Sequence, residues 1–253
     1  MSSRPDSDLP LMADGFRERG AQVTRQEAFV DAAFAFALSL LVISANEIPK
    51  SIPALLLAMR GVPAFAGCFL QVAWFWHAHV RWSRRYGLDD GRSTVLSLLL
   101  VFLVLVYVYP LRILFGTFFA WISQGWFPWP IAPLHSIGEL MSMFVVYGVA
   151  FATLSLTLAA LYAHALRQRQ ALNLSIDEAA QTAGVVVAWR LSAAVGLLSI
   201  LAALIITLTL QPGEGDWRLG LPGMLYFTLH FSGLVIRRTI AKARLQYQQE
   251  LSP

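Results

Sequence analysis

The chain has 253 residues, of which 57% are hydrophobic and 13% charged, and its mean hydropathy is positive. This composition excludes an ordinary soluble protein and indicates an integral membrane protein. The net charge of +4 does not call for a nucleic-acid partner, because Lys and Arg in a membrane protein mark the cytoplasmic loops. A single cysteine, Cys68, excludes an intrachain disulfide and a multi-cysteine metal site.

The amino-terminal residues are polar and charged and contain no apolar signal-peptide region, so we expect a disordered cytoplasmic tail over 1–24. Six apolar runs follow, each long enough to cross a hydrocarbon core of ~30 Å. They cover about 27–46, 60–80, 93–119, 136–166, 183–210 and 219–236. Pro49 and Pro53 are expected to end the first helix, and Pro110 to kink the third. The sequence thus predicts an all-α protein with six transmembrane helices in 25–236 and a basic cytoplasmic tail over 237–253.

Basic residues gather on one side of these six runs. Fifteen of the nineteen Lys and Arg residues lie in the amino tail, the 81–92 loop, the 167–190 connection and the carboxyl tail. The positive-inside bias therefore predicts that both termini are cytoplasmic. With this topology Asp31, residues 76–79 and residues 93–97 lie at similar depth, where a buried polar cluster could form. Alternatively, Trp74, Trp76 and Trp82 are interfacial anchors, and His77 and His79 extend to the headgroups.

The first apolar run carries an acid and a stripe of small side chains. A carboxylate at the centre of a membrane helix costs about 2.5–3.5 kcal/mol, so Asp31 is expected to face protein and to be paired. Small residues on one helix face let another backbone approach closely. These residues are Ala28, Ala32, Ala35 and Ser39. The first helix is therefore expected to contact protein rather than lipid on all sides.

No catalytic constellation is apparent, so neither an enzyme nor a cofactor or metal site is predicted. HExxH, P-loop and GxGxxG motifs are absent from the sequence. His77 and His79 are two residues apart, so on a helix their side chains diverge and cannot chelate one metal. The paired interrupted helices of many transporters do not recur in two halves. A subunit that builds a pore by oligomerising around its first helix fits better, although an apolar stripe on that helix is also typical of plain packing.

Several motifs resemble those of one family. The segment 25–31, RQEAFVD, and the following AAFAFALSLLV resemble the RxxxFSD motif and first helix of the transmembrane protein 175 family, the endolysosomal potassium channels and their bacterial relatives. The stretch FWHAH, with Trp76 and His79, resembles the family's WxxH at the end of the second helix. YVYPLRILFG resembles the proline-containing end of the third helix. The resemblance is strongest over 25–42 and 69–115.

The resemblance implies a homotetramer in which four copies of the first helix line a potassium pore without a TVGYG-type filter. By position, the resemblance places Phe36 at the narrow hydrophobic point of the pore and Ser39 in the hydroxyl layer. Leu40 and Ile43 would line the pore farther from the motif. Hydrophobic constrictions gate by dewetting, and hydroxyls can replace part of an ion's hydration shell. Two of these pore residues depart from the family: Phe36 is larger than the usual aliphatic side chain, and Ser39 replaces threonine.

In that family the RxxxFSD motif has a structural role and does not line the pore. The resemblance implies a network that holds the pore helix in place, made of Arg25, Phe29, Asp31, Trp76, His79 and a polar group of the third helix. Ser97 is the approximate stand-in for the asparagine expected there. Val30 replaces the motif serine and removes a hydroxyl.

We therefore expect a passive potassium-selective or weakly selective cation channel in a bacterial inner membrane. Its partners would be potassium ions, the lipid bilayer and its own copies; metal binding would be limited to transient K⁺. Two alternatives stay open. One is a non-conducting scaffold or sensor of the same fold, and the other is a proton-coupled secondary transporter that uses Asp31.

Overall fold

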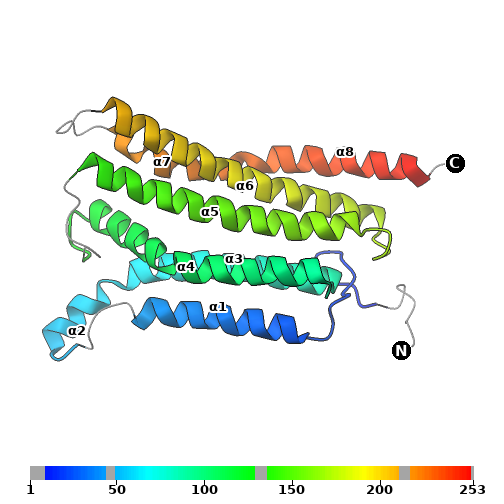
Figure 1. The fold of residues 1–253 in the computed structure, drawn as a ribbon, viewed down its shortest axis with the longest axis horizontal. Coiled ribbons are helices and arrows are strands. Elements are labelled where there is room, and N and C mark those ends of the chain that lie inside the picture. Colours follow the sequence, from blue (N-terminus) through cyan, green and yellow to red (C-terminus); the bar gives the residue numbers. More distant parts are fainter. Residues whose placement is uncertain (1–8, 44–48, 129–135, 211–216, 252–253) are drawn as a thin grey trace.

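The structure, a computed structural model, describes residues 9–43, 49–128, 136–210 and 217–251. These residues form long helices that run along a common direction, and α1 lies at one edge of the bundle (Figure 1). The long helices are α1 (Arg25–Ile43), α3 (Val62–Tyr86), α4 (Gly91–Ile122), α5 (Ile137–Arg167), α6 (Ile176–Thr209) and α8 (Gly233–Leu251). The short ones are α2 (Ile52–Met59), η2 (Trp217–Gly220), α7 (Leu221–Met224) and η3 (Leu225–Ser232).

Among the described residues, four helical stretches are long and apolar enough to cross a membrane: α4, α5, α6 and Trp217–Glu250. The pair α2 and α3, bent by 43° at the break between them, makes a fifth. Within the described residues α1 is not among these candidates, so six spans per subunit stay a prediction. The coarser expectation of an all-helical membrane protein is confirmed.

Helix boundaries differ from the apolar runs where local capping chemistry acts. Pro53 lies in the first turn of the unexpected helix α2, whose amino end is capped by Ser51, because proline is tolerated where no N–H partner is needed. The helix α6 begins at Ile176 rather than near 183. Its start is set by a capping box in which Ser175 and Glu178 exchange hydrogen bonds between side chains and backbone N–H groups. The first apolar run extends to about residue 46, but in the part of the chain that the structure describes the helix α1 ends at Ile43.

Two further expectations about the chain's course need correction or refinement. The helix α4 continues through Pro110 to Ile122, and its far end turns away from the direction of the rest (Figure 1). The basic segment after 236 is not separate from the last apolar run, because α8 begins at Gly233, inside that run, and continues through the basic segment.

Part of the amino-terminal segment, residues 9–20, is ordered where the sequence predicts disorder. These residues, which we call the strap, contain the fully buried Phe16 and an isolated bridge between Leu11 and Arg17. The strap packs against the ends of α3 and α6 through the polar contacts described below. A polar segment can order without an apolar run when its charges are paired and hydrogen-bonded.

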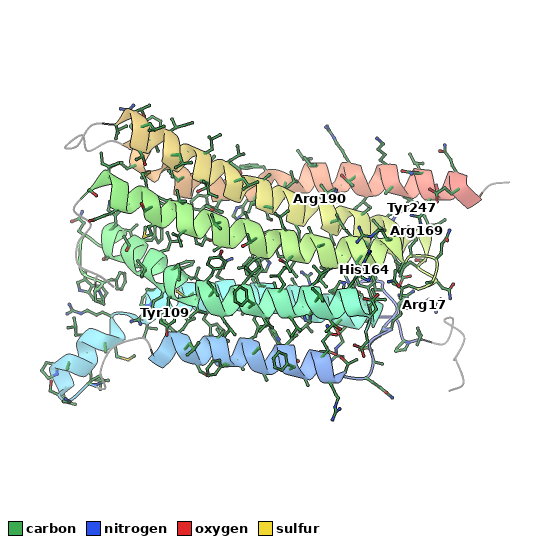
Figure 2. All side chains as sticks on the ribbon, viewed as in Figure 1. Arg17, Tyr109, His164, Arg169, Arg190 and Tyr247 are labelled. Carbon is green, nitrogen blue, oxygen red and sulfur yellow. The ribbon has the colours of Figure 1, made fainter. Side chains whose placement is uncertain are left out.

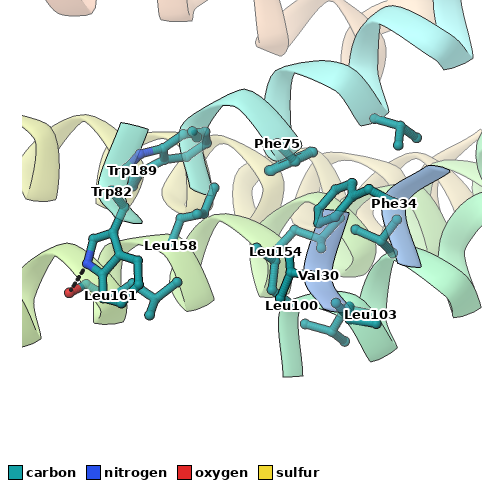
Figure 3. Close-up of a cluster of buried hydrophobic side chains, with 14 of the residues drawn as sticks. Val30, Phe34, Phe75, Trp82, Leu100, Leu103, Leu154, Leu158, Leu161 and Trp189 are labelled. Carbon is teal, nitrogen blue, oxygen red and sulfur yellow. Dashed lines mark hydrogen bonds between the residues drawn. The ribbon is translucent and has the colours of Figure 1, made fainter. Parts of the chain in front are cut away.

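The hydrophobic core lies between α1, α3, α4, α5 and α6 (Figure 3). Trp82 is buried there and donates its indole N–H to the Leu161 carbonyl at 3.1 Å. Farther along, the ring of Trp189 lies 4.9 Å from that of Trp74 and 5.7 Å from that of Phe75, centroid to centroid. These aromatic contacts join α3 to α6. The helix α1 therefore packs against a bundle whose other helices also contact one another.

Candidate ion-conduction site

The helix α1 has one buried and one exposed face in the single subunit. Val30, Phe34, Ala37 and Leu41 recur at helical spacing, are all buried and face the core (Figure 3). The helices that α1 contacts are α3 and α4. Its other face carries side chains that remain exposed: Phe29, Ala32, Ala35, Phe36 and Ser39. The helix is therefore attached to the bundle along one stripe and open along the other.

The expected pore-lining residues differ in how far their side chains are exposed on this open face. The side chain of Phe36 is 55% exposed and that of Ser39 is exposed, whereas Leu40 is partly buried and packs against the core. The side chain of Ile43 lies outside the described residues. The hydroxyl of Ser39 donates to the Ala35 carbonyl at 3.0 Å. Because this bond uses the proton, the oxygen keeps its lone pairs for an electropositive partner.

The polar cluster expected near the start of α1 occurs as two separate pairs. Trp76 donates its indole N–H to Asp31 Oδ1 at 2.8 Å, which joins α3 to the half-buried acid of α1. His79 Nε2 lies 3.0 Å from the Ser97 hydroxyl, and this pair joins α3 to α4. His79 is 1% exposed and Ser97 is fully buried, so His79 does not extend to the headgroups. His77, by contrast, is exposed.

The structure does not bring Arg25 and Phe29 into this cluster within one subunit. Both side chains are exposed. Among the described residues, Arg25 makes no hydrogen bond or ion pair. The start of α1 is instead joined to α4 by Gln26, whose side-chain oxygen accepts from the Thr94 hydroxyl at 2.9 Å and whose amide nitrogen donates to the Ser93 carbonyl at 3.3 Å. The sequence offers no distinctive signal for this link.

A second polar group, missed by sequence reasoning, surrounds Asp90 in the α3–α4 loop. Asp90 caps α4 by accepting from the Ser93 N–H at 2.8 Å. The same carboxylate lies 2.6 Å from His164 Nε2 and 2.7 Å from Gln168 Nε2, both near the end of α5. Burial alone would raise the pKa of Asp90, but the Ser93 N–H, His164 and Gln168 together hold it well below its ordinary value. The available cue is an aspartate three residues before Ser93 at the start of a long apolar run, which is the spacing of an N-cap.

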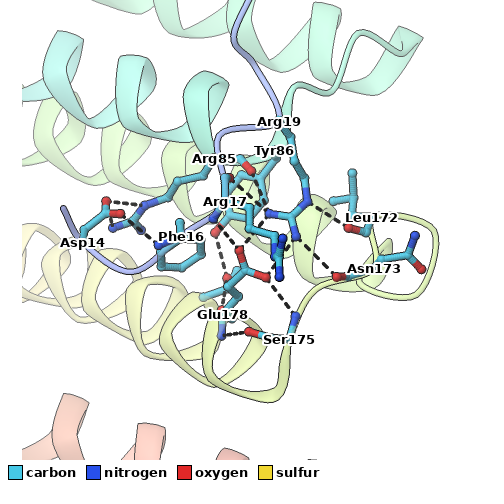
Figure 4. A network of polar contacts seen from close by, with 11 residues as sticks. Asp14, Phe16, Arg17, Arg19, Arg85, Tyr86, Leu172, Asn173, Ser175 and Glu178 are labelled. Carbon is cyan, nitrogen blue, oxygen red and sulfur yellow. Dashed lines mark hydrogen bonds and ion pairs between the residues drawn. The ribbon is translucent and has the colours of Figure 1, made fainter. Parts of the chain in front are cut away.

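The strap forms a third polar group (Figure 4). Arg19 pairs with Glu178 of α6 at 2.9 Å, with side chains that are 7% and 2% exposed. Arg85 of α3 pairs with Asp14 at 2.9 Å, and its guanidinium lies 4.0 Å from the ring centroid of Phe16. Burial raises the pKa of Asp14, whereas the Arg85 hydrogen bond lowers it, and the net pKa is below the ordinary value.

The described residues contain no preformed metal-binding site. No group of three or more His, Cys, Asp or Glu side chains in 9–43, 49–128, 136–210 and 217–251 is placed to hold an ion.

These features define an all-helical membrane protein with an exposed face on its first long helix. The model of the family described as "Endosomal/lysosomal potassium channel TMEM175" matches residues 25–110. A potassium channel from Marivirga tractuosa is 37% identical over 218 residues, which cover 84% of this chain and 85% of that protein. A crystal structure of a variant of the potassium channel MtTMEM175, in complex with a nanobody–MBP fusion protein, aligns with a TM-score of 0.76 and 32% identity. The alignment covers 92% of this chain and all of that one.

The chain belongs to the TMEM175 family of potassium channels. The resemblance inferred from residues 25–42 and 69–115 is thereby confirmed. The relatives are channels rather than enzymes, which makes a non-enzymatic role plausible for this chain.

Proposed function

We propose that this protein conducts potassium passively, as a potassium-selective or weakly selective cation channel built from four copies around a central pore. The observation that carries the proposal is the division of α1 into a stripe held in the core and an open stripe that includes Phe36 and Ser39. A helix with one face anchored and one face open suits a position between its own subunit and a shared central path. The names of the relatives, all potassium channels, support the same activity.

The chemistry of the open stripe fits a pore that gates by dewetting. Four phenylalanine rings at one level would form an apolar ring in which water is poorly held, and an ion passing it loses hydration. The hydroxyl oxygens of Ser39, with their protons directed to Ala35, would offer lone pairs next to that ring. Ser39 would thus replace part of the lost hydration, while Leu40 and Ile43 would line the path farther from the motif.

In this proposal the pairs made by Asp31 and His79 hold the helix rather than the ion. Asp31 accepts a hydrogen bond from Trp76, and His79 lies against Ser97 in the core. The first pair joins α1 to α3, and the second joins α3 to α4. Arg25 would contribute through its charge near the membrane surface. With both termini on the basic side, the host would be the inner membrane of a bacterium.

A second function, a non-conducting scaffold of the same fold, is favoured by the size of Phe36. A ring of four phenylalanines is bulkier than a ring of aliphatic side chains and would narrow the path further. A proton-coupled transporter would need Asp31 to exchange protons with the solution, whereas Asp31 accepts a hydrogen bond from Trp76 that joins α1 to α3.

Potassium flux into liposomes that contain the purified protein separates these functions. The only gradient is one of potassium, with valinomycin-loaded and protein-free liposomes as controls. A channel gives flux with no other driving ion, whereas a transporter requires a proton gradient and saturates with potassium. A scaffold gives no flux. Measurement of the particle mass in detergent by light scattering tests the count of four.

A further inference from the structure

The strap is fixed to α6 by a buried and fully hydrogen-bonded ion pair (Figure 4). Arg19 donates from Nη1 to Glu178 Oε1 at 2.9 Å and from Nη2 to Oε2 at 3.0 Å. It also donates from Nε to the Leu172 carbonyl at 2.9 Å. Glu178 in turn accepts from the backbone N–H of Arg17 and from that of Ser175, each at 2.8 Å. A bidentate pair of this kind has one geometry, so it fixes the strap's position.

A second set of contacts fixes the strap to the end of α3. The N–H of Gly20 donates to the Arg84 carbonyl at 3.0 Å. A Cβ atom at position 20 would lie only 2.3 Å from the Ser83 carbonyl oxygen, so glycine is required for this close approach. Together with the pair of Asp14 and Arg85, these contacts hold the strap between α3 and α6.

The fixed strap is connected to α1 by a very short tether. Thr24 caps α1, because its hydroxyl accepts from the N–H of Glu27 at 3.1 Å. Only residues 21–23 separate this cap from Gly20. Four residue steps of extended chain span at most about 14 Å. The start of α1 therefore cannot move independently of the strap beyond that reach.

We propose that Arg19 and Glu178 are positioning residues for ion conduction: their pair holds the strap, and the strap sets where the first turn of α1 lies. This inference rests on the proposed function, in which the open face of α1 lines the pore. The helix transmits the position of its first turn to Phe36, three turns away, because an α-helix is stiff over this length. Neither residue contacts the ion path.

The first test breaks the pair and leaves the shape of both side chains nearly unchanged. Glu178→Gln removes the charge. Arg169→Gln is the matched control, because Arg169 forms an exposed ion pair with Glu250, 2.8 Å apart, at the same end of the bundle without touching the strap. Two quantities are measured: hydrogen exchange of the peptides covering 9–20 and 25–31, and the reversal potential in planar bilayers under a potassium–sodium gradient.

We expect Glu178→Gln to speed exchange of the strap on the order of tenfold, and to speed exchange in the first turns of α1 as well. The reversal potential should shift, since a displaced helix changes the constriction; a loss of folded protein alone would lower the current without this shift. Arg169→Gln should change neither quantity. Faster exchange of the strap, with α1 and the reversal potential as in the wild type, would show that the pair holds the strap but that the strap does not position α1, and would overturn the proposal.

A second variant tests the tether without touching the pair. Three glycines inserted after Gln22 lengthen the link but leave Arg19, Glu178 and Gly20 in place. The strap should keep its wild-type exchange, while the first turns of α1 exchange faster and the reversal potential shifts. An insertion with no effect on α1 overturns the proposal even if Glu178→Gln fails to fold. If the wild-type protein carries no potassium current, the proposed function fails, and exchange in residues 25–31 alone decides whether the strap positions α1.

Discussion

The indole N–H of Trp76 is 2.8 Å from Asp31 Oδ1, and this hydrogen bond ties α1 to α3 at the one acid inside the apolar part of α1. A carboxylate at membrane depth is tolerated where it is paired. Asp31 is half-buried and Trp76 is 38% exposed, so the pair lies at the edge of the core rather than within it. The contact therefore suits an anchor of α1 better than a free proton acceptor.

The anchoring role of Asp31 predicts that its loss weakens assembly more than it changes selectivity. Asp31→Ala should lower the dissociation temperature of the oligomer, measured by size-exclusion chromatography after heating, because about 1 kcal/mol per subunit is lost with the hydrogen bond. Trp76→Phe should cost at least as much, because it leaves the charged acceptor unpaired. An altered reversal potential with normal assembly would instead place Asp31 in the ion path.

Phe36→Ala should raise the potassium flux or loosen selectivity, because four missing rings widen the constriction and make it easier to wet. The flux is measured in potassium-loaded liposomes at equal protein content. Phe231→Ala is the matched control, since Phe231 is 80% exposed on η3 and lies outside α1. Unchanged flux in a stably folded Phe36→Ala protein contradicts the assignment of Phe36 to the pore.

Ser39→Ala should reduce the preference for potassium over sodium, because it removes the hydroxyl oxygen that would replace part of the ion's hydration shell. Ser39→Thr restores an oxygen at the same position and should keep the wild-type preference. Bi-ionic reversal potentials measure the ratio. Equal ratios for all three proteins would remove Ser39 from the conduction path, whereas a fall in current without a change in ratio would indicate only a packing defect.

The Asp90 group predicts a loss of stability in acid. Its folded-state pKa lies below the ordinary value of 3.8, so the carboxylate stabilises the folded state above that value, and the contribution disappears as the pH falls through the folded pKa. Thermal unfolding in detergent at pH 6 and at pH 3 should therefore show a smaller acid-induced loss for Asp90→Asn, which keeps a cap for α4. Identical pH dependence of the two proteins would mean that Asp90 is not the responsible group.

Local patterns in the sequence determined much of this protein. Apolar runs longer than a bilayer needs predicted the long helices, and the motif around Arg25 and Asp31, with Trp76 and His79, identified the family. These signals are local: a helix needs only the periodicity and caps of its own residues, and a motif needs only residues close in the chain. Hydropathy does not place the start of α6, because the capping box at Ser175 and Glu178, although also local, lies in a polar stretch before the apolar run.

Partners far apart in the chain were decided by the tertiary structure alone. Arg19 lies 159 residues from Glu178, and no periodicity relates them, so the sequence predicts a disordered tail where the structure has a polar strap. The expected network likewise separated into Asp31 with Trp76 and His79 with Ser97, without Arg25. The division of α1 into an attached and an open face has the same origin. The sequence shows apolar residues on all sides of that helix. Only packing against α3 and α4 determines which side chains are buried and leaves Phe36 and Ser39 exposed.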